Sequence, residues 1–199
     1  MVATVAAMRY DVATALLVVD VQNDFADPSG SLYVPGGEDV IEFINGQIAA
    51  AAAGGATVVY SQDWHPESTP HFEKDGGVWP VHCVADSEGA AFHPRLDVIA
   101  DAIFIKKGVA GEDGYSAFNL RDPVTGVQSS TGLAERLDGI EKVVVVGLAL
   151  DYCVKETAID AAGLYDTTLL ADGTRPVDLA IGDGARSVAE MLAADVTVV

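Results

Sequence analysis

The stretch KVVVVGLALDYCVKETAIDAA, Lys142–Ala162, decides the fold. It opens with the β-branched run Val143–Val146, which is typical of a strand buried on both faces of a parallel sheet, and Gly147 ends that run. From Asp151 onward, apolar and polar residues follow a helical spacing. The stretch therefore predicts a buried strand, a turn and a helix, with Cys153 in the first turn of that helix.

The position of Cys153 makes it a candidate nucleophile. The free backbone N–H groups and the positive end of the helix dipole favour a thiolate, so we expect a thiol pKa of roughly 3.5 to 7.5 instead of about 8.5. The same N–H groups could hold a developing oxyanion. The alternative is a buried apolar cysteine, as most free cysteines are, and this stretch alone does not separate the two.

The composition limits the class of protein and its partners. With 199 residues, half of them hydrophobic and 21% charged, the chain fits a single globular domain over residues 1–199. A net charge of −19 argues against nucleic acid and anionic membranes as partners, because the protein would repel both. We therefore expect a small-molecule partner.

The cysteines and the start of the chain bear on location. Cys83 and Cys153 lie far apart and define no disulfide framework, which fits a reducing cytoplasm. The apolar run within residues 1–11 is too short for a signal peptide, and no 18-residue apolar span follows. We expect neither export nor a membrane span.

The segment Ala15–Asp20 predicts a buried strand that ends in a carboxylate. In open α/β sheets, ligands bind at the carboxyl ends of the strands. The DVQNDF turn that follows lacks the glycine-rich fingerprint of a dinucleotide site, which argues against a Rossmann cofactor domain. Asp20 is therefore a candidate site residue, or else a cap for the next element.

A carboxylate and three histidines follow the second predicted strand, Thr57–Ser61. Asp63 and His65 stand at positions i and i+2, which share a face on an extended chain. His71 and His82 follow in the same loop of about thirty residues, and a loop of that length is more often functional than accidental. We predict a metal site here; the alternative is a set of ordinary surface histidines.

The two long loops contain further candidates. Trp79 and Phe72 could wall a pocket or anchor the first loop to the core. The predicted strand Ala102–Lys107 ends in a lysine that could be an active-site cation, although a surface lysine is the commoner case. The glycine-rich loop Gly108–Thr131 could lie over the same sheet edge as a lid.

Strand and helix patterns alternate along the chain. The remaining predicted helices are Glu38–Ala53, Leu133–Leu137 and Asp178–Ala194, and the remaining strands are Thr167–Asp172 and Val196–Val199. The alternation implies parallel strands joined by right-handed crossovers. We predict an α/β fold, a three-layer α/β/α sandwich with a mostly parallel sheet of about six strands. Four chemically apt residues would then meet at its carboxyl edge: Asp20, Asp63, Lys107 and Cys153.

Together these motifs resemble the nicotinamidases of the isochorismatase-like cysteine hydrolase superfamily. The resemblance covers nearly all of the chain and is carried by VVDVQNDF, QDWHP, WPVHC, KKGVAGEDGYSAF, VGLALDYCVKETA and ADGTRPV. VDVQNDF alone marks only the superfamily, whereas the combination of motifs is highly specific.

The resemblance implies catalytic roles. The family triad of aspartate, lysine and cysteine falls on Asp20, Lys107 and Cys153. Lys107 is preferred to Lys106 because the family lysine directly precedes a glycine. The family also has a cis peptide before the nucleophile, here expected between Leu148 and Ala149, with the N–H groups of Ala149 and Cys153 directed at the oxyanion.

The resemblance also implies binding roles. The family's metal ligands fall on Asp63, His65 and His82, and His71 matches a further ligand of some members. Positions that line the nicotinamide ring fall on Phe25, Trp79 and Tyr115. The ligand set suits a divalent metal ion, namely Zn, Fe or Mn, without selecting one of them.

The implied activity is hydrolysis of nicotinamide to nicotinate and ammonia through a cysteine thioester, a step of NAD salvage, with pyrazinamide as a second expected substrate. A possible homo-oligomer is left open. One alternative is another isochorismatase-like hydrolase, although those relatives generally lack the Asp-x-His and WPxHC ligand set that is intact here. A non-catalytic metal-binding domain is the other, and the complete triad argues against it.

Overall fold

The structure is a computed structural model that describes residues 8–199. The segment 1–11 that was considered for an export signal therefore lies largely outside the described residues. Within residues 8–199, no helix is both long enough and apolar enough to cross a membrane.

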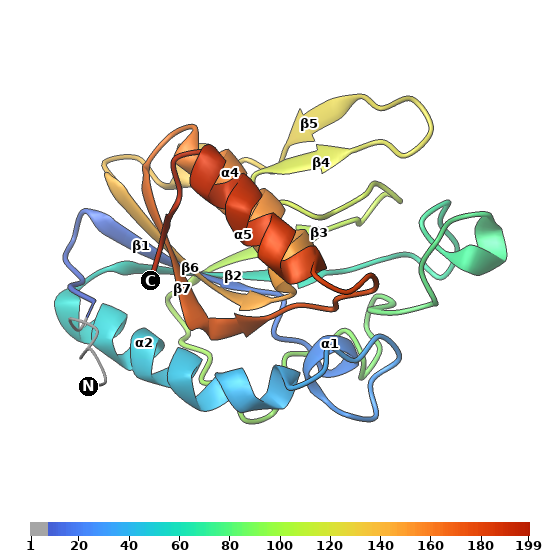
Figure 1. Cartoon of the computed structure of the whole chain (residues 1–199), viewed down its shortest axis with the longest axis horizontal. Helices are drawn as coiled ribbons and strands as arrows, with labels where there is room; N and C mark the ends of the chain where they lie inside the picture. The colour runs from blue at the N-terminus through green and yellow to red at the C-terminus, as the bar shows by residue number, and fades with distance from the viewer. Residues whose placement is uncertain (1–7) are drawn as a thin grey trace.

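A six-stranded parallel sheet forms the middle layer, in the order β3-β2-β1-β6-β7-β8 (Figure 1). Its strands are β1 (Thr14–Val19), β2 (Thr57–Asp63), β3 (Ile103–Lys107), β6 (Lys142–Leu148), β7 (Asp166–Arg175) and β8 (Thr197–Val198). The predicted strand number and direction are confirmed. Because all neighbours run the same way, their carboxyl ends share one edge of the sheet.

The order of the strands reverses between β1 and β6. From β1 the chain builds outward to β3, then returns to the other side of β1 and builds outward again to β8. The loops that leave β1 and β6 therefore diverge, and a crevice between such loops is where open α/β sheets bind ligands. Asp20 follows β1 and Cys153 follows β6, so both lie at this crevice.

Helices cover both faces of the sheet, which confirms the three-layer sandwich. Helix α2 (Ile41–Gly54) lies on one face, and α4 (Lys155–Ala162) and α5 (Asp183–Ala193) lie on the other (Figure 1). Strand β1 serves both layers, because Leu16 and Val18 belong to the α2 core while Leu17 and Val19 belong to the opposite core. Such two-sided burial is the reason that the strands read as continuous apolar runs.

Several boundaries differ from the predictions. Helix α2 ends as expected, with Gly55 in the left-handed region at φ 74°. The helix predicted from Asp178 begins only at Asp183, because Gly182 adopts φ 91° and the preceding residues form a loop. The helical segment predicted from Asp151 begins at Leu150 with a single π-helical turn, Leu150–Val154, which leads into α4.

Short elements inside the predicted loops were missed. They are α1 (Asn23–Ala26) and an antiparallel hairpin of β4 (Asn119–Arg121) and β5 (Gln128–Ser130). The short helix predicted over Leu133–Leu137 is confirmed as α3 (Leu133–Arg136). The hairpin strands are three residues long and largely exposed, so neither displays a hydrophobic period. The hairpin projects from the main body on the side of β3 and α4 (Figure 1).

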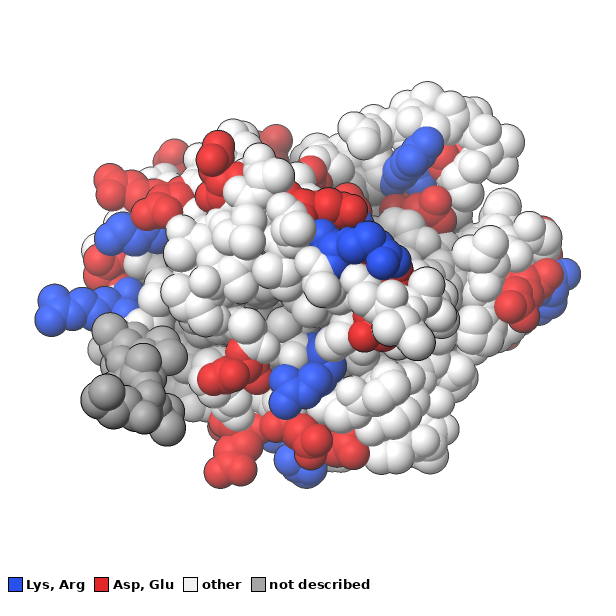
Figure 2. Space-filling model, viewed as in Figure 1, with Lys and Arg blue, Asp and Glu red and all other residues white. Residues whose placement is uncertain are grey.

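The surface reflects the acidic composition. On the face in Figure 2, acidic side chains are distributed over most elements, with basic side chains scattered among them. Lysines and arginines form no continuous stripe on this face.

Candidate active site

Four predicted residues meet at the carboxyl edge of adjacent strands. Asp20 follows β1, Asp63 ends β2, Lys107 ends β3, and Cys153 lies in the π-helical turn after β6. All four are buried, with exposed fractions of 0% for Asp20 and Lys107, 5% for Asp63 and 6% for Cys153. The sheet thus brings together residues that are up to 133 positions apart, since 153 − 20 = 133.

Lys107 lies at the centre of this group. Its Nζ donates a hydrogen bond to Asp20 Oδ2 at 2.6 Å and lies 3.0 Å from Asp63 Oδ1. It also donates to the backbone carbonyls of Gly114 and Tyr115. The alternative of a surface lysine is therefore wrong, and the two carboxylates raise the pKa of Lys107 although burial alone would lower it.

Lys106 faces away from the site. Its Nζ lies 3.2 Å from the centroid of the Trp64 ring, which is a cation–π contact. Successive side chains of a strand point to opposite faces, so only one of the two lysines can reach Asp20. The geometry agrees with the choice of Lys107.

Asp20 is held in a strained backbone conformation and a saturated hydrogen-bond environment. Its φ is 49°, and its Oδ1 accepts a hydrogen bond from Ser61 Oγ at 2.7 Å while Oδ2 accepts from Lys107. Burial raises the pKa of Asp20 to about 6, although Lys107 opposes the shift. A carboxylate with that pKa is ionised at neutral pH and can accept a proton.

Cys153 lies beside Asp20. Its Sγ is within 4.8 Å of a carboxylate oxygen of Asp20 and one of Asp63. The expected low thiol pKa is wrong: burial, together with the two carboxylates, raises the pKa of Cys153 above its usual range, against the opposing effect of Lys107. The thiol therefore needs a base to become a nucleophile, and Asp20 is placed to be that base.

Three histidines form a cluster next to the triad. His65, His71 and His82 are all buried, and each offers a ring nitrogen within 4.8 Å of the others. Asp63 Oδ2 lies 3.7 Å from His65 Nε2 and 3.8 Å from His82 Nε2. The alternative of ordinary surface histidines is wrong.

The donor atoms of this cluster fit a divalent metal ion. Both ring nitrogens of His65 are buried without a hydrogen-bond partner, which is rare for polar atoms in a folded protein. Nδ1 of His82 is bonded to the carbonyl of Pro80 at 2.7 Å, which leaves Nε2 with its lone pair. Burial lowers the pKa of His82 to about 4, so the imidazole is neutral, as a metal ligand must be.

The residue after Lys107 must be glycine for a steric reason. Gly108 has φ 73°, and a Cβ there would lie 2.5 Å from Cε1 of His65. A side chain at this position would push His65 out of the cluster. The Lys-Gly pair of the motif thus serves the triad with its first residue and the histidine cluster with its second.

A pocket connects the triad and the histidine cluster to solvent. It encloses about 370 Å³ of space, including its open mouth. Its lining comprises Phe25, Leu32, Val34, Asp63, His71, Trp79, His82, Tyr115, Ala149, Tyr152, Cys153 and Val177. The three residues predicted to line a ring, Phe25, Trp79 and Tyr115, are all among them.

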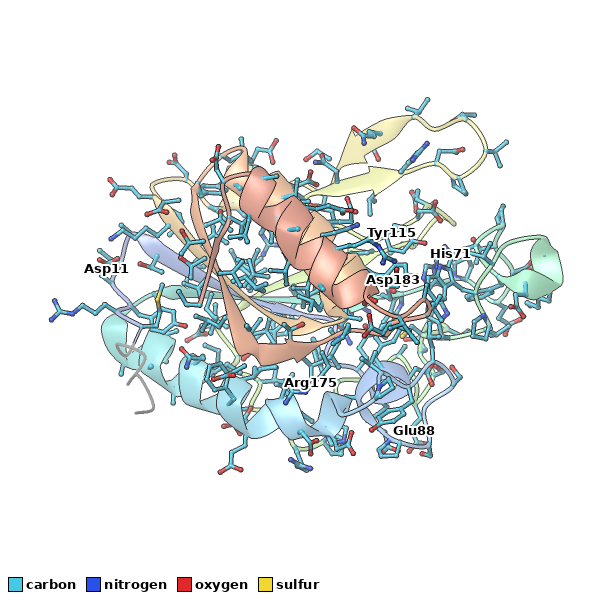
Figure 3. The ribbon with its side chains drawn as sticks, in the orientation of Figure 1. Asp11, His71, Glu88, Tyr115, Arg175 and Asp183 are labelled. Atoms are coloured by element: carbon cyan, nitrogen blue, oxygen red, sulfur yellow. The ribbon has the colours of Figure 1, made fainter. Side chains whose placement is uncertain are left out.

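Aromatic side chains form one wall of the pocket. Trp79 Nε1 donates to Tyr115 Oη at 2.8 Å, and the Trp79 and Tyr152 rings meet edge to face at 4.8 Å. Tyr115 and His71 lie close together beyond the carboxyl edge of the sheet (Figure 3), with their ring centroids 5.8 Å apart. Phe72 is fully buried beside His65, so it anchors the loop.

The predicted lid is only partly such a structure. The first part of loop 108–131 lies at the edge, where Tyr115 lines the pocket and Gly114 accepts from Lys107. The later part folds into the β4–β5 hairpin, beside a separate surface cleft. The peptide bond between Leu148 and Ala149 is cis, as expected.

Sequence reasoning missed residues that line or support the pocket. Tyr152 precedes the candidate nucleophile and was recognisable by that position, whereas Leu32 and Val177 come from distant segments with no local signal. Gln22 clamps Asp63, because its Nε2 donates to the carbonyl and its Oε1 accepts from the N–H of that residue, both at 2.8 Å. A buried glutamine in the turn after a strand was the available signal.

Asp151 performs a similar task for the nucleophile turn. Its carboxylate accepts hydrogen bonds from the N–H groups of Val177 at 2.9 Å and Asp178 at 2.8 Å. These contacts tie the turn that contains Cys153 to the loop after β7, and they bring Val177 into the pocket wall.

The sequence and the fold of the chain are similar to those of known proteins. Residues 14–191 match the isochorismatase domain family. The chain is 39% identical to the nicotinamidase of Escherichia coli over 202 aligned residues, which cover 92% of each protein. A pyrazinamidase of Pyrococcus horikoshii, solved in complex with zinc, superposes with a TM-score of 0.82 at 35% identity, over 94% of this chain and 98% of that one. A protein of L. infantum, solved in complex with nicotinate, superposes with a TM-score of 0.85 at 36% identity, over 98% and 96%.

Proposed function

The chain belongs to the isochorismatase family, and from that premise we propose that it is an amidohydrolase that converts nicotinamide to nicotinate and ammonia. One observation carries the proposal: a buried thiol, carboxylate and ammonium group adjoin a histidine cluster in a single aromatic pocket. The similarity to curated nicotinamidases over most of the chain supports it.

Acylation begins with the thiol of Cys153. Asp20 takes the thiol proton while the sulfur attacks the carboxamide carbon, forming a C–S bond and moving the carbonyl electron pair onto oxygen. The backbone N–H groups of Ala149 and Cys153 receive that oxyanion. Both residues line the pocket, and Asp20 adjoins the sulfur, so the reacting groups are within reach of one bound molecule.

Two further steps complete the cycle. The tetrahedral intermediate collapses with cleavage of the C–N bond, and Asp20 gives its proton to the departing ammonia, which leaves a thioester on Cys153. A water molecule then attacks the thioester and loses a proton to Asp20. The C–S bond breaks, the sulfur regains the proton, and nicotinate leaves.

Lys107 supports these steps by charge. Its ammonium group is fully buried, and at low effective dielectric a fixed positive charge stabilises the thiolate and oxyanion that form beside it. It also keeps Asp20 ionised in an environment that favours the neutral acid. Lys107 thus opposes the effect of burial, which by itself would favour the neutral forms of Asp20 and Cys153.

The residues beside the triad could hold a divalent metal ion. Asp63, His65 and His82 would hold it, with His71 as a fourth ligand, and the donor set admits Zn, Fe or Mn. When bound, such an ion supplies a Lewis acid with an open position for a ring nitrogen or a water molecule. Trp79, Tyr115 and Phe25 orient the ring beneath the sulfur of Cys153.

The same pocket suits pyrazinamide, which has a carboxamide and a ring nitrogen in the same relation. We place the reaction in NAD salvage, as for nicotinamidases, and in the cytoplasm, where a catalytic thiol stays reduced. The unit of function proposed is the single domain.

The proposal is tested by release of ammonia and nicotinate from nicotinamide by metal-loaded protein. We expect the two products in equal amounts and no turnover by the Cys153→Ala variant. Turnover of isochorismate or a carbamoyl amine, with none of nicotinamide, would assign the chain to another activity of the family. Metal binding without turnover of any amide would leave a non-catalytic domain.

A further inference from the structure

His71 has a contact that the other two histidines of the cluster lack. Its Nδ1 lies 2.7 Å from Oδ1 of Asp113, which comes from the other long loop of the site, 42 residues further along the chain. The exposed fraction is 5% for the side chain of His71 and 23% for that of Asp113, so water screens the contact only in part. Asp113 itself belongs neither to the catalytic triad nor to the expected ligand set.

The chemistry of the contact fixes the state of the imidazole. An ionised carboxylate can only accept a hydrogen bond, so the ring proton of His71 is on Nδ1 and the lone pair is on Nε2. Histidines that bind metals usually donate the second ring N–H to such an acceptor, which sets the tautomer, orients the ring and raises the basicity of the ligating nitrogen. For His82, the corresponding acceptor is the backbone carbonyl of Pro80.

The backbone of Asp113 is itself held firmly. Its N–H donates to the carbonyl of Arg121 at 2.7 Å, and its carbonyl accepts from the N–H of Arg121 at 3.1 Å. Arg121 is the last residue of β4, so the hairpin fixes the position of the carboxylate from behind. The exposed β4–β5 hairpin thereby supports the backbone of Asp113 at the edge of the site.

Two more hydrogen bonds join the same two loops. Thr69 Oγ1 donates to the carbonyl of Gly111 at 3.1 Å, and Trp79 Nε1 donates to Tyr115 Oη. The loop that contains His71 and the loop that contains Asp113 thus form one unit with three cross-links. His71 and Asp113 are the central pair of the three.

We propose that Asp113 is a positioning residue for the metal centre, which holds His71 in the tautomer and orientation of a fourth ligand and so sets the affinity of the site for its ion. The proposal rests on the metal site of the proposed function. It does not depend on the substrate, because it concerns binding of the ion alone.

The test is a titration of metal-free protein with Zn²⁺ in the presence of a competing chromophoric chelator. We expect Asp113→Ala to raise the Kd for Zn²⁺ by about 10 to 100-fold, the usual effect of losing such a partner. Asp113→Asn keeps an acceptor for the Nδ1 proton but not the charge, so its Kd should lie between those of Asp113→Ala and the unaltered protein. A Kd for Asp113→Ala within about twofold of the unaltered protein would overturn the proposal.

Two controls separate the contact from other effects. Glu112→Gln removes the same charge one residue away from a side chain that bonds only to the N–H of Ala110, and it should leave the Kd unchanged. In a His71→Ala background, Asp113→Ala should add nothing to the loss, because Asp113 acts through His71. A full, additive loss in that background, or an equal loss in Glu112→Gln, would show a general electrostatic or folding effect instead.

Because the titration needs no turnover, its result is independent of the substrate. Loss of Zn²⁺ affinity in a protein that does not hydrolyse nicotinamide would support Asp113 and refute the proposed function. Turnover of nicotinamide with unchanged Zn²⁺ affinity in Asp113→Ala would do the reverse. Circular dichroism of each metal-free variant is the check that its fold is retained.

Discussion

The two halves of the site differ in how well the chain satisfies its own polar groups. In the triad, Asp20 uses both carboxylate oxygens and Lys107 donates to Asp20 and to two carbonyls. In the histidine cluster, both ring nitrogens of the buried His65 lack a hydrogen-bond partner. The groups lie side by side and are similarly buried, so burial does not account for the difference.

The difference separates a network that the polypeptide completes by itself from one that needs an additional group. A buried polar network with unsatisfied members makes the folded state less stable than an apolar core would. Such a network is therefore expected where a bound group satisfies the remaining polar atoms. We infer that the triad is complete as folded, whereas the histidine cluster still requires a bound ion. Lys107 links the two halves, because its Nζ is hydrogen-bonded to Asp20 and lies 3.0 Å from Oδ1 of Asp63.

The largest expected effect breaks the triad and leaves the cluster intact. Cys153→Ala should lower kcat by at least about 10⁴-fold, because the nucleophile is lost, while the protein keeps its fold and its metal. The measurements are ammonia release and metal content of the purified variant. Retained turnover would end the assignment of the nucleophile, and lost metal would mean that the halves are not separable.

Lys107→Ala should damage both halves. Removing the ammonium group leaves Asp20 and Asp63 buried without their partner, and we expect a loss of about 10³-fold in kcat and of about 3–5 kcal/mol in the free energy of unfolding. The pKa of Cys153 should rise further, because Lys107 is the group that lowers it. The rate of alkylation of Cys153 by iodoacetamide as a function of pH measures the pKa of its thiol.

Lys106→Ala is the matched control. Its side chain lies on Trp64 and not in the site, so turnover and alkylation should change by less than about threefold. The opposite ranking of the two lysine variants would mean that the lysine of the triad is wrongly chosen.

Benzamide tests whether the histidine cluster, with its ion, recognises the ring nitrogen of the substrate. It has a C–H where nicotinamide has the ring nitrogen, so it cannot replace the bond of a displaced metal-bound water. We expect its kcat/KM to be at least about 100-fold below those of nicotinamide and pyrazinamide. Asp63→Ala should lose metal and narrow that gap. Equal rates for benzamide and nicotinamide in the metal-loaded protein would show that the histidine cluster serves structure or catalysis and does not recognise the ring nitrogen.

The smallest effect concerns the protonation of the triad alone. Burial raises the pKa of Asp20 to about 6, and the ionised form is the active base, so kcat/KM should be level above that pH and fall about tenfold per pH unit below it. The pH profile of kcat/KM for nicotinamide measures the free enzyme. A level profile down to pH 4.5 would contradict the assignment of Asp20 as the base.

The sequence predicted most of the framework because the relevant signals are local. Continuous apolar runs are typical of strands that are buried on both faces of a sheet. Three such runs were recognised, and all of them form interior strands of the sheet: Val143–Val146, Ala15–Asp20 and Thr57–Ser61. The start of α5 and the β4–β5 hairpin were not predicted, because a left-handed glycine and two three-residue strands leave no periodic pattern.

The identities of the chemical groups were also readable from the sequence. Asp20, Lys107 and Cys153 follow strands, and parallel strands must end at one edge, so their convergence follows from the topology. Asp63 with the three histidines of one loop indicated a metal site for a similar reason, since residues close in the chain can converge at little cost in loop entropy.

Only the tertiary structure decided the electrostatics and the supporting contacts. The helix start next to Cys153 predicted a lowered thiol pKa, but desolvation and two carboxylates from other strands raise it instead. The bond from Asp113 to His71 and the clamp of Gln22 on Asp63 span 42 and 41 residues. Burial and contacts of that range depend on the position of every neighbouring group in space, and a pKa or a ligand's orientation responds to those positions and not to the order of the residues.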